Sequence, residues 1–361
     1  MSRPFNFSAG PSMIPVDVLE ELSENMVNYQ STGLSLIEVS HRGPVYDEVH
    51  NSAVSLIKEL MNIPDNYSVL FIGGGATLQF SMIPMNLMSG GRSADYVNSG
   101  AWAKKAIAEA EKEGSVNIVY DGSDNNFSVL PDPEDVKPSE GSSYLHITSN
   151  ETIGGIQWKA FPDTGDVPLV ADMSSDILSR SVDVSRFGLI YAGAQKNLGP
   201  SGVTVVIIRN DLLERSSENL GAYLSYAVHA KSNSLYNTPP VFPIWAMKLI
   251  LEKIKEKGGA SAVAEKNRKK AEVLYSAIDN SEGFYVSPVG KQYRSDMNVV
   301  WRLADESLEP VFIKEAAENG LIGLKGHRSV GGCRASLYNA MTLEGVNALT
   351  SFMGDFARKN G

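Results

Sequence analysis

The stretch YAGAQKNLGPSGVTVVIIRN, residues 191–210, shows the pattern that decides the fold. A short apolar run precedes Lys196, and a Gly-Pro turn separates this lysine from a second run rich in β-branched residues. β-Branched residues favour strands, and glycine and proline interrupt them. We therefore predict two strands here, with Lys196 just beyond the end of the first.

Five similar apolar runs occur earlier in the chain. Each is bounded by Gly, Asn, Asp or Ser, as strands are: SVLFIGGG, ADYVNSG, VNIVYDG, YLHITSN and PLVADMSS. Helical patterns occur at about residues 76–88 and 101–113, and two more precede the first run, at PVDVLEELSENMVNY and at about residues 45–61. Several runs are apolar on both faces, which is typical of strands covered by helices on each side. The sequence thus predicts an α/β fold with a mostly parallel seven-stranded sheet.

The pattern changes near residue 242, where two long helical segments begin, FPIWAMKLILEKIKEK and SAVAEKNRKKAEVLYSAI. Beyond them, the order strand, strand, helix, strand, strand, helix predicts a small α/β sandwich. A chain of 361 residues also exceeds what one hydrophobic core usually organises. We place a large domain at residues 16–260 and a small domain at residues 1–15 and 261–361.

The composition, 43% apolar and 20% charged, is that of an ordinary globular chain, and the formal net charge is −10. A nucleic-acid binder would present a basic stripe, so we expect no nucleic-acid partner. The start, MSRPFNFSAGPSMIP, has no apolar signal segment, and runs such as VVII are too short to span a bilayer. We expect a cytoplasmic protein without membrane contact. Cys333 is the only cysteine, which excludes an internal disulfide and a cysteine-based zinc cluster, and no histidine spacing indicates a metal.

Ligands of open parallel sheets bind beyond the carboxyl ends of the strands, so the residues after each apolar run are candidates for a site. The segment GGGATLQF, residues 73–80, follows a strand and begins a helix, whose first N–H groups suit an anion such as phosphate. It has neither the lysine of a nucleotide P-loop nor the spacing of a dinucleotide fingerprint. On this segment alone, a tight turn without a ligand is an equally good interpretation.

Asp172 and Lys196 follow successive predicted strands, so we expect them to be neighbours. Asp172 suits a protonated ring nitrogen, although a lone aspartate at a strand end more often caps a helix or a turn. A partly desolvated Lys196 has a lowered pKa, and its amine can attack a carbonyl to form a Schiff base. The alternative is a solvated lysine that begins a loop. Trp102 offers an aromatic face to a planar heterocycle, although filling a core is the commoner use of tryptophan.

Arginine and histidine occur together in two pairs, His41-Arg42 and His327-Arg328, and Arg334 follows the second pair. The planar guanidinium suits carboxylate or phosphate groups, although loop arginines more often lie on a solvated face. Their neighbouring glycines favour a site. An anion-binding loop, an aspartate, a stacking aromatic and a reactive lysine are together what pyridoxal phosphate requires of a protein.

These motifs make the chain resemble the phosphoserine aminotransferase family, in the class V branch of fold type I pyridoxal-phosphate enzymes. The resemblance covers nearly the whole length. It includes FNFSAGP, EVSHRG, GGGATLQF, SGAW, NETIGG, ADMSSDILSR, IYAGAQKNLGPSG, LYNTPP and GHRSVGGCRASLYNA. It implies a large domain built on the seven-stranded sheet and a smaller C-terminal α/β domain.

The resemblance also implies contacts with the cofactor. Lys196 is expected to hold it covalently, Asp172 to pair with its ring nitrogen, and Trp102 to stack on its ring. The remaining expected contacts are Ala76, Thr77 and Gln195 at the phosphate, Thr152, and, from the other subunit of a homodimer, Asn237 and Thr238.

For the substrate, the resemblance implies that Arg334 binds the α-carboxylate. The distal phosphate, or the side-chain carboxylate of glutamate, is expected to contact His41, Arg42, His327 and Arg328. Two positions depart from the family's pattern, because many members have arginine where this chain has Thr77 and serine where it has Ala9. Thr77 still offers a hydroxyl and an N–H, but one possible contact with the substrate phosphate is lost.

The implied reaction is a ping-pong transamination between L-glutamate and 3-phosphohydroxypyruvate, which gives 2-oxoglutarate and O-phospho-L-serine in serine biosynthesis. Lys196 is expected to be displaced by the incoming amine and then to act as general base and acid. The same chemistry extends to the 4-phosphohydroxythreonine pair of vitamin B6 (pyridoxine) biosynthesis.

Three alternatives remain at this point. A cysteine desulfurase needs a nucleophilic cysteine on a mobile loop, whereas Cys333 begins a predicted strand. An alanine or serine:glyoxylate aminotransferase has less use for the two His-Arg pairs. A protein that binds the cofactor without turnover is the alternative from a different functional class.

Overall fold

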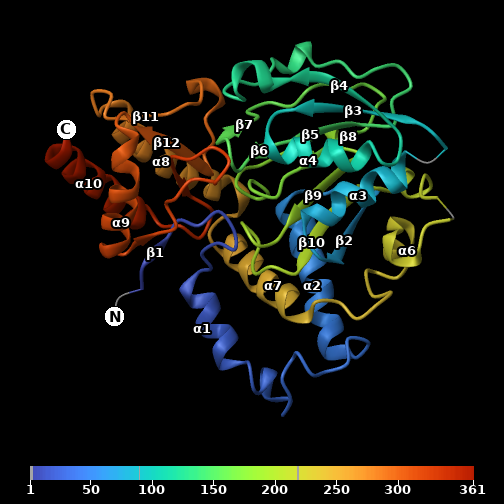
Figure 1. Cartoon of the computed structure of the whole chain (residues 1–361). Helices are drawn as coiled ribbons and strands as arrows, with labels where there is room; N and C mark the ends of the chain where they lie inside the picture. Colours follow the sequence, from blue (N-terminus) through green and yellow to red (C-terminus); the bar gives the residue numbers. More distant parts are fainter. Residues whose placement is uncertain (1–2, 89, 218) are drawn as a thin grey trace.

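The computed structural model describes residues 3–88, 90–217 and 219–361, and its central element is a seven-stranded sheet (Figure 1). Across the sheet, the strands are β2 (Tyr67–Gly73), β10 (Val203–Arg209), β9 (Leu189–Gly193), β8 (Leu169–Asp172), β5 (Leu145–Thr148), β3 (Ser93–Asn98) and β4 (Ser115–Asp121). All neighbours are parallel except β10, which runs antiparallel to β2 and β9. The connection from β9 to β10 is too short for a crossover, so β10 must run back. The predicted α/β fold with a mostly parallel sheet is confirmed.

Helices cover both faces of this sheet. Along β10, Val203, Val205 and Ile207 belong to the core on one face, while Val206 and Ile208 belong to the core on the other. The first face is covered by α1 (Val16–Glu24), α2 (Pro44–Leu60) and α7 (Val241–Glu256). The second is covered by α3 (Ala76–Leu87), α4 (Ala101–Ala110), α5 (Asn210–Leu213) and α6 (Tyr226–Lys231). This arrangement explains why the strands are apolar on both faces.

The C-terminal part of the chain forms a third core beside this layered body (Figure 1). Its helices are α8 (Gly259–Asp279), α9 (Glu309–Glu318) and α10 (Leu343–Asn360). Its antiparallel sheet contains β11 (Tyr285–Val286), β12 (Asn298–Leu303) and β14 (Cys333–Ser336). The remaining predicted strand, β13 (Leu321–Ile322), pairs instead with β1 (Phe5–Asn6) from the start of the chain. This separate core supports the division that we propose near residue 260.

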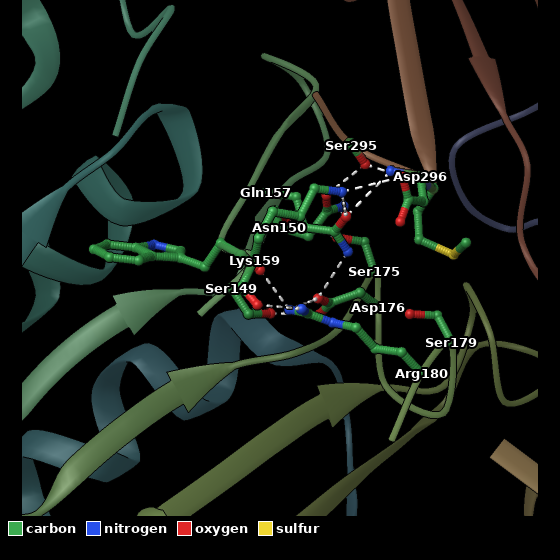
Figure 2. A network of polar contacts seen from close by, with 12 residues as sticks. Ser149, Asn150, Gln157, Lys159, Ser175, Asp176, Ser179, Arg180, Ser295 and Asp296 are labelled. Atoms are coloured by element: carbon green, nitrogen blue, oxygen red, sulfur yellow. Dashed lines mark hydrogen bonds and ion pairs between the residues drawn. The ribbon is translucent and has the colours of Figure 1, made fainter. Parts of the chain in front are cut away.

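A short hairpin, formed by β6 (Asn150–Glu151) and β7 (Ile156–Gln157), lies between the large sheet and the third core (Figure 1). The side-chain amide of the buried Asn150 donates to Ser175 Oγ at 2.8 Å and to Asn298 Oδ1 at 2.7 Å. Its carbonyl oxygen accepts a hydrogen bond from Ser295 Oγ at 2.6 Å (Figure 2). Ser175 follows β8, whereas Ser295 and Asn298 belong to the C-terminal part, so one side chain connects the two bodies.

A second group of polar contacts fixes the same hairpin through Asp176 (Figure 2). Its carboxylate accepts hydrogen bonds from Ser149 Oγ and from Gln157 Nε2, the latter at 3.2 Å, and lies 3.5 Å from Arg180. Ser149 Oγ also lies 2.9 Å from the carbonyl oxygen of Asp172. Both strands of the hairpin are therefore attached to the segment that follows β8.

Lys270, in α8, fixes the segment that follows β14. Its buried ammonium donates to the carbonyl oxygens of Leu337 at 2.8 Å, Tyr338 at 2.7 Å and Met341 at 3.0 Å. Three N–H donors thus meet three acceptors, which is the full capacity of a protonated lysine.

We expect Lys270→Met to lower the free energy of unfolding by about 2 kcal/mol or more, because three carbonyl groups each lose a hydrogen bond and only that of Tyr338 keeps another donor, the N–H of Met341, within the described residues. Urea denaturation measures this. Lys269→Met, at the neighbouring exposed position, is the matched control and should change the free energy by no more than about 0.5 kcal/mol. Equal effects of the two substitutions would contradict the role given to Lys270.

Candidate active site

Asp172 and Lys196 lie at the same edge of the sheet. Asp172 is the last residue of β8, and Lys196 lies three residues beyond the end of β9, the adjacent parallel strand. Both side chains line one cavity of about 340 Å³. The sequence prediction that they are neighbours is confirmed, and their position beyond the carboxyl ends of the strands is the one that open parallel sheets use for ligands.

Nine of the residues predicted to form a site line this cavity. They are Ala76, Thr77, Trp102, Thr152, Asp172, Gln195, Lys196, His327 and Arg334. The cavity is also lined by Ala9, Gly10, Gly75, Ile153 and Ser174, which the sequence analysis did not assign to the site. Segments far apart in the chain, from residue 9 to residue 334, therefore meet here.

The other predicted residues are not among the described residues that line the cavity: His41, Arg42, Asn237, Thr238 and Arg328. Arg42, Asn237, Thr238 and Arg328 are exposed, and His41 is partly buried. Asn237 Nδ2 donates to the carbonyl oxygen of Thr238 at 3.0 Å. Their roles stay predictions, and those of Asn237 and Thr238 require a second subunit.

The amine of Lys196 is held within the cavity. Its Nζ donates to Thr152 Oγ1 at 2.6 Å and lies 5.3 Å from the centroid of the Trp102 ring. Burial lowers the pKa of Lys196 to about 8, although the nearby carboxylates of Asp172 and Glu151 oppose this shift. The main chain is fixed as well, because Ser12 Oγ donates to the carbonyl oxygen of Lys196. A fixed amine with a lowered pKa has the properties of a nucleophile and of a proton carrier.

Asp172 both caps a turn and lines the cavity, the two roles between which the sequence did not decide. Its Oδ1 accepts the N–H of Ser174 at 2.8 Å, which forms a local turn, and the residue also lines the cavity. Burial raises the pKa of Asp172, while the charge of Lys196 lowers it. A carboxylate in this environment is stabilised by a cation placed opposite to it.

The N-terminus of α3 supplies the anion-binding part of the cavity. Gly75 is the capping residue, and no side chain in the described parts of the chain caps this helix. The first N–H groups of a helix have no acceptor within the helix, and Ala76 and Thr77, the first two residues of α3, line the cavity. The positive end of the helix dipole adds to their attraction for an anion.

Trp102 lies in the first turn of α4, and its ring forms another wall. The ring also packs against Phe80, with centroids 6.4 Å apart. The buried indole Nε1 has no hydrogen-bond partner among the described residues. The aromatic surface and the unpaired donor suit a planar polar ligand better than they suit a closed apolar core.

Arg334, on β14, brings a guanidinium to the cavity from the third core. Its Nη1 donates to the carbonyl oxygen of Thr152 at 3.3 Å, and its Nε has no partner within the described ranges. Burial, together with the charges of Arg334 and Arg328, lowers the pKa of His327. A guanidinium with free donors is suited to a carboxylate.

Sequence reasoning missed one charged residue of this region, Glu151. It is buried, and burial raises the pKa of Glu151 to about 7, opposed by the backbone N–H groups of Ala103 and Trp102. The motif NETIGG contains this residue. Its partners are backbone N–H groups of α4, which only folding brings close to it, so no pattern in the sequence indicated this contact.

Cys333 lies within β14 and is buried. Burial raises the pKa of its thiol, so the thiolate is not formed at neutral pH. The nucleophile that a cysteine desulfurase needs is therefore not supplied by this residue.

Comparisons with known proteins show the family of the chain. Residues 4–349 match the model of the family "Aminotransferase class-V". The chain therefore belongs to the class V aminotransferases. A phosphoserine aminotransferase from Geobacillus kaustophilus (strain HTA426) is 55% identical, with 99% of each chain covered.

Solved structures give the same result. The phosphoserine aminotransferase from Bacillus circulans subsp. alkalophilus is 52% identical, with a TM-score of 0.98 and 99% of each chain covered. The pyridoxal-phosphate-bound phosphoserine aminotransferase from Trichomonas vaginalis is 38% identical, with a TM-score of 0.90 and coverage of 98% of this chain and 100% of the other. The predicted family, fold type, enzyme class and cofactor are confirmed.

The residues present fit pyridoxal phosphate. The uncapped N-terminus of α3 suits its phosphate, the Trp102 ring its heterocycle, the Asp172 carboxylate its ring nitrogen, and the Lys196 amine its aldehyde. A cavity of about 340 Å³ lies within the usual range for small-molecule sites.

Covalent attachment of the cofactor requires the unprotonated amine of Lys196. Because burial lowers its pKa to about 8, the rate of attachment to the cofactor-free chain should rise with pH and be half-maximal at a pH of about 8. Stopped-flow absorbance after mixing with pyridoxal phosphate measures this rate. A rate that keeps rising to a pH of about 10 would instead indicate an ordinary solvated lysine.

Proposed function

We propose that this chain exchanges an amino group between L-glutamate and 3-phosphohydroxypyruvate, giving 2-oxoglutarate and O-phospho-L-serine. The observation that supports this most is that one cavity combines the amine of Lys196 and the guanidinium of Arg334 with the anion-binding end of α3. Relatives that are identical at half of their positions or more are named phosphoserine aminotransferase, which supports phosphoserine as one of the substrates.

In this proposal, Ala76, Thr77 and Gln195 bind the phosphate of the cofactor. Asp172 would pair with the ring nitrogen, Trp102 would stack on the ring, and Thr152 would be a further contact with the cofactor. When bound, pyridoxal phosphate supplies an aldehyde that accepts the amino group and a conjugated ring that delocalises negative charge. The carboxylate of Asp172 keeps the ring nitrogen protonated, which favours that delocalisation.

Lys196 has two tasks in turn. Its Nζ would hold the cofactor, and the same Nζ, once free, would take the proton from the substrate's α-carbon. Its pKa of about 8 is near the operating pH, as efficient acid and base catalysis requires. Thr152 Oγ1, at 2.6 Å, keeps the amine pointed into the cavity.

Substrate recognition is divided between two groups of residues. Arg334 binds the α-carboxylate, which all amino-acid substrates share, through the donors that its contact with Thr152 leaves free. The distal phosphate or carboxylate contacts His41, Arg42, His327 and Arg328. Since only His327 of these four lines the cavity of a single chain, the proposal includes a homodimer that completes the site, with Asn237 and Thr238 contributed across the interface.

The proposal extends to the 4-phosphohydroxythreonine pair of vitamin B6 biosynthesis, whose phosphate is also distal to the amino group. We also propose that the protein is located in the cytoplasm. Within the described residues, no helix is sufficiently long and apolar to cross a membrane.

The holoenzyme provides the test. We expect the absorption band of the lysine-bound cofactor to disappear on addition of L-glutamate or O-phospho-L-serine and to return with 2-oxoglutarate. L-Alanine and L-serine, which have no distal anion, should act at least about 100-fold less efficiently, because a desolvated charge pair is lost. Lys196→Ala, which has no amine to bind the cofactor, is the control and should not show this band.

Equal efficiency with phosphorylated and plain amino acids would contradict the proposed substrate. Cofactor binding without any loss of the band would point to a binding protein without turnover.

A further inference from the structure

Glu151 is a buried charged residue without a task in the proposed reaction. Its Oε2 accepts the backbone N–H of Trp102 at 3.1 Å, and its Oε1 accepts the backbone N–H of Ala103 at 2.9 Å. The residue is 1% exposed. One carboxylate thus accepts the N–H groups of the second and third residues of α4, where the helix dipole favours a negative charge.

The contact depends on a close approach that a glycine permits. A Cβ at Gly100 would lie 2.7 Å from Cδ of Glu151 and 3.0 Å from its Oε2. Any larger residue at this position would displace the carboxylate from the end of α4. The chain therefore combines a glycine before the helix with a glutamate from a distant hairpin.

The hairpin holds the backbone of Glu151 in place. The preceding residue, Asn150, is held by three side-chain hydrogen bonds, and the following residue, Thr152, contacts both Lys196 Nζ and Arg334 Nη1. The carboxylate therefore keeps a defined distance from the amine on one side and from α4 on the other.

We propose that Glu151 is a positioning residue that acts through Trp102. By fixing the first turn of α4, it sets the position of the Trp102 ring at the cavity wall. This inference rests on the proposed stacking of Trp102 on the cofactor ring.

The alternative action of Glu151 is a direct charge effect on Lys196. The hydrogen bonds favour the first explanation, because both carboxylate oxygens are used by α4 while Lys196 Nζ donates to Thr152 Oγ1. If Glu151 acts through Trp102, substitutions of the two residues must be non-additive.

The first test needs neither cofactor nor turnover. In the cofactor-free chain, hydrogen exchange of at least one of the Trp102 and Ala103 amides should become about tenfold faster in Glu151→Gln, because one of the two acceptor oxygens is replaced by an NH2 group that cannot accept an N–H. Gly100→Ala should have a similar effect without any change of charge. Glu111→Gln, on the exposed end of α4, is the control and should leave both amides unchanged.

The second test uses the holoenzyme and a double-mutant cycle. Glu151→Gln should weaken cofactor binding and reduce the visible circular dichroism of the bound cofactor, as Trp102→Ala does. The double variant Glu151→Gln/Trp102→Ala should bind the cofactor no more weakly than Trp102→Ala alone. Gly100→Ala should follow Glu151→Gln in both readouts.

Additive losses in the double variant, or unchanged exchange of the two amides, would overturn the proposal. If Glu151→Gln does not fold, Gly100→Ala replaces it in both the hydrogen-exchange test and the double-mutant cycle. If the substitutions of Glu151 and Trp102 are non-additive but the unsubstituted chain does not turn over O-phospho-L-serine, only the proposed substrate is refuted.

Discussion

The hydrogen bond from Lys196 Nζ to Thr152 Oγ1 is the contact on which the site depends. It joins the end of β9 to the hairpin of residues 150–157 inside a cavity where burial already lowers the pKa of the amine. Without that acceptor, a lysine side chain has enough freedom to leave the cavity for solvent. The hairpin therefore decides where the reactive nitrogen lies.

Three consecutive residues of this hairpin serve three parts of the molecule. Asn150 connects the segment after β8 with the third core, Glu151 holds the start of α4, and Thr152 contacts the lysine and Arg334. The polar chain continues from Asn298 to Tyr338, whose hydroxyl donates to the carbonyl oxygen of Ala9 at the cavity wall. The segments that line the cavity from the two parts of the chain are thus kept in register by buried hydrogen bonds, each of which is costly to leave unmade.

The sequence was sufficient for the parts of the fold that follow from apolar periodicity. All seven strands of the large sheet could be predicted, because each contains an apolar run bounded by turn residues, and Lys196 and Asp172 follow from their places after two such runs. The hairpin could not be predicted, since strands of two residues have no period. Glu151 was missed for a related reason: its partners are backbone N–H groups of α4, which no residue type reveals. The roles of Asn237 and Thr238 concern a second chain and stay predictions.

The most direct measurement reduces the holoenzyme with borohydride, which makes the attachment of the cofactor permanent, and maps the labelled peptide by mass spectrometry. We expect one label, on Lys196. A label on another lysine, such as Lys105, whose Nζ lies 4.4 Å from the Trp102 ring centroid, would contradict it, as would a tightly bound cofactor that acquires no covalent link.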